Sequence, residues 1–173
     1  MKRFEKGSKL GQVITKDDIV KWKADGRDVI FSSGTSTGKT TFVLVNLMEY
    51  CKENNERILF VCSRKVLAEE VRGLILENKI DNIDVTTYQA IENKLKNNQE
   101  VNLDYDWITL DEAHYFLEIF NRYTDISFKW LTKHPAQKIY MSATCDQLFD
   151  SFVQNGLVPS KHYYSIDRDY SYI

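Results

Sequence analysis

The sequence is poor in the residues that interrupt or cross-link a chain. Its 173 residues include only two prolines and seven glycines. The three cysteines, Cys51, Cys62 and Cys145, are odd in number and form no Cys-x-x-Cys pair. This spacing indicates neither a disulfide framework nor a zinc site. We therefore expect a reduced, cytoplasmic protein. The length suits one domain, or one domain and a small part of another.

Long apolar runs and an excess of one charge are also missing. No apolar run approaches the roughly 18 residues of a membrane span, and the N-terminus, MKRFEKGSKLGQ, lacks the apolar centre of a secretory signal. Lys plus Arg number 23 and Asp plus Glu number 25, which gives a net charge of -2. A domain that binds nucleic acid by bulk electrostatics would be basic. Any nucleic-acid contact must therefore involve a local strip of the surface, and not the surface as a whole.

The chain does contain short apolar runs that alternate with helical periodicity. This pattern indicates βαβ units and an α/β fold, with a mostly parallel sheet and helices on both faces. Thr15 with Asp18 predicts a capping box at the start of a helix that ends at Gly26. The expected strands are 28–33, 57–62, 83–88, 105–110 and 137–142, and further helices are expected over 41–51, 67–75 and 89–97 and after Thr144.

The stretch SSGTSTGKT, residues 32–40, follows an expected strand and opens an expected helix. Phosphate binding needs converging backbone N–H groups, a helix N-terminus and a lysine. Gly38 allows close backbone approach, Lys39 supplies charge, and the Thr40 hydroxyl is placed to bind Mg²⁺. The usual phosphate loop, however, has a glycine where this chain has Ser33. A Ser/Thr/Gly turn before an N-capped helix is the alternative.

The stretch WITLDEAH, residues 107–114, is an apolar strand followed by two carboxylates. Ligands of open α/β sheets bind at this end of the strands. There Asp111 would hold Mg²⁺, while Glu112 would orient and deprotonate the attacking water. Taken alone, Asp-Glu after a strand is more simply a helix start favoured by the helix dipole. Together with the phosphate loop, it favours a nucleotide site.

GKT, DEAH and Ser-Ala-Thr at 142–144 follow one another in this order, each after an expected strand. This combination resembles the DEAD/DEAH-box proteins of superfamily 2 helicases and translocases. Two weaker matches look like motif Ia of that family, at Ser63-Arg64, and its motif Ib or Ic region, at 86–89. The resemblance implies a RecA-like P-loop NTPase lobe over 27–160. An N-terminal extension with one helix, 1–26, would precede it, and a strand or linker toward a missing second lobe, 161–173, would follow.

The resemblance also implies roles for individual residues. ATP and its phosphates would be held by Gly34, Thr35, Ser36, Thr37, Gly38, Lys39, Thr40 and Thr41. Thr40 and Asp111 would bind Mg²⁺, and Lys39, Asp111 and Glu112 would form the catalytic set. Hydrolysis would be coupled to the partner lobe and to nucleic acid by His114, Ser142 and Thr144. Nucleic-acid backbone, without sequence readout, would be contacted by Ser63, Arg64, Thr86 and Thr87. Simpler roles are a helix N-cap for Thr144 and a solvated helix-start residue for Arg64.

Three departures from the family pattern limit what it implies. Ser33 and Ser36 replace an alanine and a glycine of the loop, although serine is small enough for both places. No convincing adenine-reading Q motif lies upstream. The motifs of the second lobe are absent, including its arginine finger, which typically contributes about 10³–10⁵ to the rate of phosphoryl transfer. We expect the weakly active first lobe of an ATP-dependent helicase or translocase acting on DNA or RNA.

Two other classes remain open from the sequence. A P-loop kinase would need an arginine-rich lid, and the arginines here are scattered. An ATP-gated nucleic-acid-binding module without turnover would have a degenerate catalytic set, whereas Lys39, Asp111 and Glu112 are all present.

Overall fold

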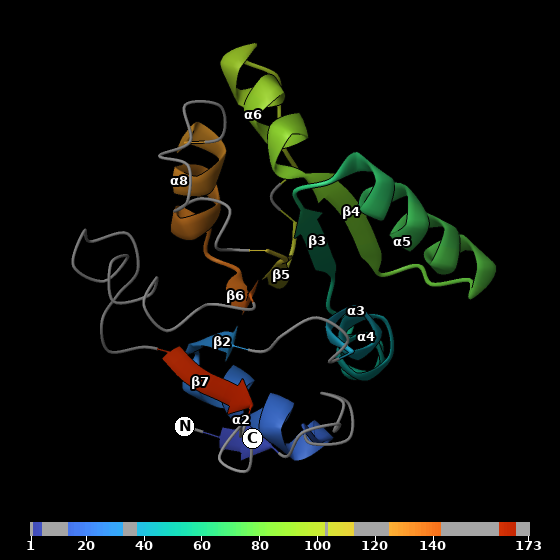
Figure 1. The fold of residues 1–173 in the computed structure, drawn as a ribbon, viewed down its shortest axis with the longest axis vertical. Helices are drawn as coiled ribbons and strands as arrows, with labels where there is room; N and C mark the ends of the chain where they lie inside the picture. The colour runs from blue at the N-terminus through green and yellow to red at the C-terminus, as the bar shows by residue number, and fades with distance from the viewer. Residues whose placement is uncertain are drawn as a thin grey trace.

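Within the described part of the chain, the computed structural model contains one seven-stranded sheet in which every strand pair is parallel (Figure 1). The structure describes residues 2–4, 14–32, 38–102, 104–112, 125–142 and 163–168, with the backbone alone at 2–4, 31–32, 125, 128, 142 and 163–168. The strands are β1 (Lys2–Phe4), β2 (Asp28–Ser32), β3 (Ile58–Cys62), β4 (Ile83–Thr87), β5 (Trp107–Leu110), β6 (Gln137–Ser142) and β7 (Tyr163–Arg168). Their order across the sheet is β1-β7-β2-β6-β5-β3-β4.

The central strands are buried on both faces. In β3 all residues are buried: Ile58, Phe60 and Cys62 belong to one core, whereas Leu59 and Val61 belong to the other. A strand covered on both sides reads as a continuous apolar run, and ILFVC is such a run. This explains why the sequence indicated a parallel sheet.

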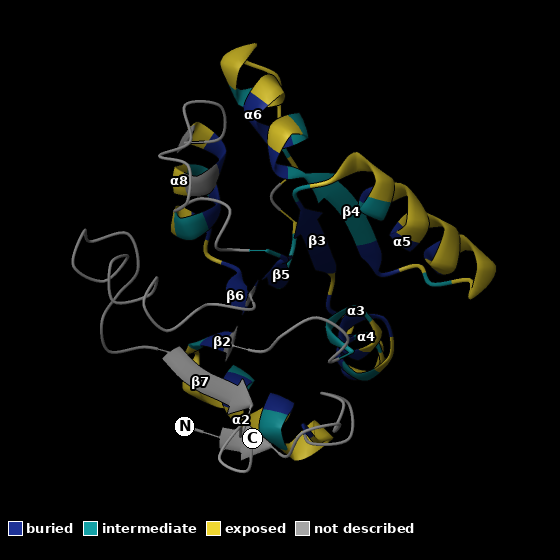
Figure 2. Ribbon diagram, in the orientation of Figure 1, coloured by how far each residue is buried: buried dark blue, intermediate teal, exposed yellow. Residues whose placement is uncertain are grey.

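Helices cover both faces of this sheet. One core receives α2 (Lys16–Asp25), α5 (Lys65–Glu77) and the helical run Lys39–Glu53. That run consists of α3 (Lys39–Thr41), a π-helical segment η1 (Phe42–Leu47) and α4 (Met48–Glu53). The other core receives α6 (Tyr88–Lys96) and α8 (Asp125–Lys133). Figure 2 shows β3 and β5 buried and the outer side of α5 exposed. The predicted α/β class, with helices on both faces, is confirmed.

Some elements differ from the sequence prediction. Tyr88 was expected to end the third strand but begins α6, because the Thr87 side chain accepts a hydrogen bond from Ala90 N at 3.1 Å and caps the helix. Helix α8 and the short strand β1 were not predicted. Strand β7 falls in the segment 161–173 and lies between β1 and β2.

The capping box of α2 is confirmed. Thr15 N donates to Asp18 Oδ2 at 2.8 Å, and Asp18 N donates to Thr15 Oγ1 at 3.4 Å. At the other end Gly26 adopts a left-handed conformation with φ 65°, and its N–H donates to Trp22 O at 3.0 Å. Both ends of α2 are therefore set by local sequence signals.

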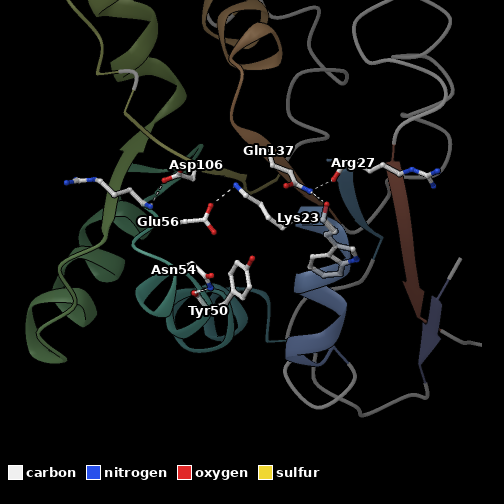
Figure 3. A network of polar contacts seen from close by, with 9 residues as sticks. Lys23, Arg27, Tyr50, Asn54, Glu56, Asp106 and Gln137 are labelled. Atoms are coloured by element: carbon white, nitrogen blue, oxygen red, sulfur yellow. Dashed lines mark hydrogen bonds and ion pairs between the residues drawn. The ribbon is translucent and has the colours of Figure 1, made fainter. Parts of the chain in front are cut away.

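Helix α2 is attached to the amino ends of the strands (Figure 3). Gln137 Nε2, at the start of β6, donates to Trp22 O at 2.7 Å and to Arg27 O at 2.5 Å. Lys23 Nζ lies 2.6 Å from Glu56 Oε2 and 5.3 Å from the centroid of the Trp107 ring. These contacts lie at the edge of the sheet where the strands begin. They do not include the opposite edge, where the carboxyl ends of the strands lie.

Helices α6 and α8 are joined by a buried carboxylate. Glu92 of α6 is 1% exposed, and its Oε2 accepts a hydrogen bond from Ser127 N at 2.6 Å. Ser127 lies in the first turn of α8, where the helix dipole favours a negative charge. Lys96 Nζ lies 3.7 Å from the other carboxylate oxygen of Glu92. The two helices on this face are therefore held together.

Gly26 and Gly73 allow the assigned backbone conformations to be tested, because a Cβ added at either would meet no atom within 4 Å. We predict that Gly26→Ala lowers the free energy of unfolding by about 1–2 kcal/mol, because alanine is strained at positive φ. Gly73→Ala, inside α5, should instead raise it by roughly 0.5–1 kcal/mol through helix propensity. Urea denaturation of both variants gives the two values. Changes of the same sign would contradict the assigned conformations.

Candidate active site

The carboxyl ends of neighbouring strands bring predicted site residues to one edge of the sheet. Strand β6 lies between β2 and β5, and β3 and β4 follow on the far side of β5. The register pairs Ser32 with Ser142, Leu110 with Val61, and Cys62 with Thr87. The described site residues that follow or end these strands are Gly38, Lys39, Thr40, Thr41, Ser63, Arg64, Thr86, Thr87, Asp111, Glu112 and the backbone of Ser142. Gly34, Thr35, Ser36, Thr37, His114 and Thr144 lie outside the described residues.

The end of the predicted phosphate loop opens a helix, as expected. Gly38 has φ 80° and ψ 28°, a left-handed conformation suited to glycine. Lys39 begins the helical run, and Phe42 N donates to Gly38 O at 2.8 Å. Lys39 and Thr40 are half-buried, and Thr41 is exposed. The run passes at once into the π-helical segment η1, a rare geometry that is frequent at functional sites.

Asp111 is fixed by its main chain. Its N–H donates to Val61 O of β3 at 2.8 Å, and its carbonyl oxygen accepts a hydrogen bond from Tyr88 Oη at 2.7 Å. Asp111 is 8% exposed, and its Oδ1 accepts from Glu112 N at 3.0 Å. The predicted metal ligand is therefore held by bonds from β3, from α6 and from its own neighbour.

Tyr88 is a residue of this site that the sequence prediction did not single out. It is 1% exposed, and burial, with the negative charge of Asp111, raises its pKa well above the usual value. The hydroxyl therefore stays protonated and remains a donor. A tyrosine directly after a strand end could have signalled this role, because a buried tyrosine hydroxyl needs a partner.

Glu112 has an unusual backbone conformation. Its φ is 50°, in the left-handed region that disfavours residues with a Cβ by about 1–2 kcal/mol. The other described non-glycine residues with positive φ, Asn55, Lys79 and Asn98, each lie just beyond the end of a helix. Glu112 instead follows strand β5. Such strain in a structure is concentrated at functional sites.

Ser63 contacts this carboxylate. Its Oγ donates a hydrogen bond to Glu112 Oε2 at 2.5 Å. The family resemblance implies that Ser63 contacts nucleic acid, so its contact with the predicted catalytic base was not anticipated. The remaining residues of this group lie beside it: Arg64 is exposed at the start of α5, and Thr86 and Thr87 are half-buried at the end of β4.

Cys62 supports this edge from within the core. Its Sγ lies 3.5 Å from Arg64 O and 3.7 Å from Thr86 O, so the thiol links the ends of β3 and β4. Burial, together with the negative charge of Asp111, raises its pKa to about 11. The thiol is therefore neutral near pH 7 and serves as a structural donor, not as a nucleophile.

The donor set at this edge fits a magnesium nucleotide. Thr40 and Asp111 offer hydroxyl and carboxylate oxygens, the ligands that Mg²⁺ prefers. Among the described residues, no group of three or more His, Cys, Asp or Glu could hold a metal by itself. Mg²⁺ is commonly bound by one or two protein ligands together with substrate phosphates, so a hydroxyl and a carboxylate are suitable in kind and number.

A separate cavity of about 590 Å³ opens at the amino edge of the sheet. It is lined by residues that include Asp28, Asp106, His134 and Lys138, and by none of the predicted site residues. Burial lowers the pKa of Lys138, whose Nζ donates to His134 O.

Within the described part of the chain, no helix has the length and apolar character needed to cross a membrane.

The strain at Glu112 can be measured independently of activity. We predict that Glu112→Gly is more stable than Glu112→Ala by about 1 kcal/mol, since glycine adopts positive φ without penalty. The same pair at Glu69, an exposed position of α5, is the control and should show glycine less stable by a similar amount. Denaturant titration of the four variants gives their free energies of unfolding, and the glycine–alanine difference at each position is compared. Glycine less stable at both positions would rule out the strain.

Comparison with known proteins gives structural matches only. No protein-family model and no curated protein matches the sequence. The helicase domain of Hef from Pyrococcus furiosus is similar in structure, with a TM-score of 0.62 and 16% identity over 89% of this chain and 38% of that chain. A hypothetical ATP-dependent RNA helicase from Sulfolobus tokodaii gives a TM-score of 0.60 and 15% identity over 88% of this chain and 51% of that chain.

The chain thus spans 38% and 51% of the two proteins that it resembles. At these identities the likeness concerns the fold. The chain therefore shares the parallel α/β fold of these two helicase structures.

Proposed function

We propose that this chain is the first motor lobe of an ATP-dependent nucleic-acid helicase or translocase, which binds Mg-ATP and hydrolyses it when paired with a second RecA-like lobe. The observation that carries the proposal is the hydrogen bond of Ser63 with Glu112 at the carboxyl ends of β3 and β5, where Asp111 also lies. Lys39 and Thr40 open the first helix after β2, which belongs to the same parallel sheet. The helicase fold supports it. The second lobe would belong to the same natural chain, in the cytoplasm.

Each residue at the nucleotide site has a physical role in this proposal. Lys39, the backbone of Gly38 and the residues from Gly34 to Thr37, with Thr41, would bind the phosphates of ATP. Thr40 and Asp111 would hold Mg²⁺, which when bound offsets the phosphate charge. The Glu112 carboxylate would orient a water molecule and accept its proton. Tyr88 supports this set by holding the main chain of Asp111.

The nucleic-acid strip would lie beside the nucleotide site. Arg64, Thr86 and Thr87, with Ser63, follow or end β3 and β4, which are adjacent strands. A hydroxyl-rich strip with one arginine can contact phosphates of DNA or RNA without reading bases. Such a strip is compatible with the net charge of -2 of the whole chain. His114, Ser142 and Thr144 would couple the two sites and the second lobe.

Nucleic-acid-stimulated ATP hydrolysis is the test of this proposal. We predict that turnover by the natural gene product containing this chain rises with single-stranded DNA or RNA, and that the chain alone is weakly active without an arginine finger. Lys39→Ala should abolish turnover, whereas Lys52→Ala, at an exposed lysine of α4, should not. Turnover that is indifferent to both polymers would favour a P-loop enzyme of another class, such as a kinase.

The role of Glu112 can be tested separately. We predict that Glu112→Gln retains ATP binding, because the phosphate ligands are unchanged, and lowers turnover by about 10²–10⁴ through loss of the base. Fluorescent-nucleotide binding and steady-state hydrolysis give the two quantities. Glu69→Gln, on the exposed side of α5, is the matched control. Full turnover in Glu112→Gln would exclude Glu112 as the base.

A further inference from the structure

The contact between Ser63 and Glu112 joins the two sites of the proposed function. The separation of 2.5 Å between Ser63 Oγ and Glu112 Oε2 is in the range of a charge-assisted hydrogen bond to a carboxylate. Both residues are half-buried, so neither is fully shielded from solvent. Ser63 comes from the end of β3, beside the proposed nucleic-acid strip, and Glu112 from the end of β5.

The backbone on each side builds this contact. The register pairs Val61 with Leu110, and Asp111 N donates to Val61 O at 2.8 Å, so Ser63 and Glu112 leave adjacent strands at the same level. Glu112 then turns through its left-handed conformation, with its N–H bound to Asp111 Oδ1. A strained backbone persists only where its surroundings hold it. The hydrogen bond from Ser63 is one such interaction.

The Ser63 hydroxyl can serve only one anion at a time. A serine hydroxyl has one proton and two lone pairs. A phosphodiester oxygen carries no proton, so it can only accept a hydrogen bond. While Ser63 donates to Glu112, it presents only lone pairs to a phosphate. Donation to Glu112 and donation to a nucleic-acid phosphate therefore exclude each other.

We propose that Ser63 is a positioning residue that holds the Glu112 carboxylate toward β3 in the absence of nucleic acid and releases it when a backbone phosphate accepts the hydrogen bond of the hydroxyl instead. This inference rests on the proposed function and adds a direct link between its two sites. The link is reciprocal: whatever loosens the Ser63–Glu112 bond should tighten nucleic-acid binding, because binding no longer has to break it.

This reciprocity allows a test that needs no hydrolysis. The affinity of the 173-residue chain for fluorescent single-stranded DNA and RNA of equal length is measured without nucleotide. We predict that Glu112→Ala tightens binding about 3- to 10-fold when Ser63 is present and less than about 2-fold in the Ser63→Ala background. Removing the Glu112 charge changes nucleic-acid affinity by the same electrostatic effect in both backgrounds. The difference between the two tightening factors therefore measures the contribution of the Ser63 hydroxyl. Ser63→Thr, which keeps a hydroxyl, should behave like the unaltered chain.

The outcomes separate this inference from the proposed function. Equal tightening in both backgrounds would overturn the role of Ser63 and leave the proposed function intact. An unaltered chain that binds neither polymer would overturn both. In the natural gene product, Ser63→Ala should raise the unstimulated kcat and leave KM for ATP unchanged. A fall in stimulated and unstimulated kcat together would indicate a merely structural serine and would also overturn the inference.

Discussion

The hydrogen bond from Asp111 N to Val61 O is the interaction on which the site depends, because it fixes the level at which β5 ends beside β3. Side chains alternate along a strand, so a slip of one residue would exchange the inward and outward positions. Asp111 would then lose its buried place, and Glu112 would no longer lie opposite Ser63. The register, set by two apolar cores, thus decides which carboxylate is buried and which is half-buried and accessible.

Burial also determines the charges at this edge. Tyr88 and Cys62 both have raised pKa values, chiefly because they are buried, and each therefore remains neutral near pH 7. Both donate to main-chain oxygen atoms: Tyr88 to that of Asp111, and the single proton of the Cys62 thiol to that of Arg64 or of Thr86. The edge is thus supported by neutral donors, which add no positive charge that would compete with Lys39 or a metal for the carboxylates.

Local signals in the sequence predicted local structure well. Thr15, Asp18 and Gly26 delimit α2 through short-range bonds, and the apolar run 58–62 is a buried strand. Tyr88 was misplaced because aromatic residues favour strands, whereas the Thr87 cap favours a helix. The Ser63–Glu112 bond could not be predicted, because it depends on the pairing of strands far apart in sequence. The roles of the site residues remain sequence predictions, and of these Gly34 to Thr37, His114 and Thr144 also lie outside the described residues.

The buried carboxylate of Glu92 has a mechanical consequence. Tyr88, at the start of α6, is bonded to the end of β5, and Glu92, one turn later, is bonded to the start of α8. Helix α8 leads into β6, and β6 pairs with β5. These links close a ring through β5, α6, α8 and β6. Because these links close a ring, we expect α6 and α8 to move together with β5 and β6 as one rigid unit, and not to slide past each other.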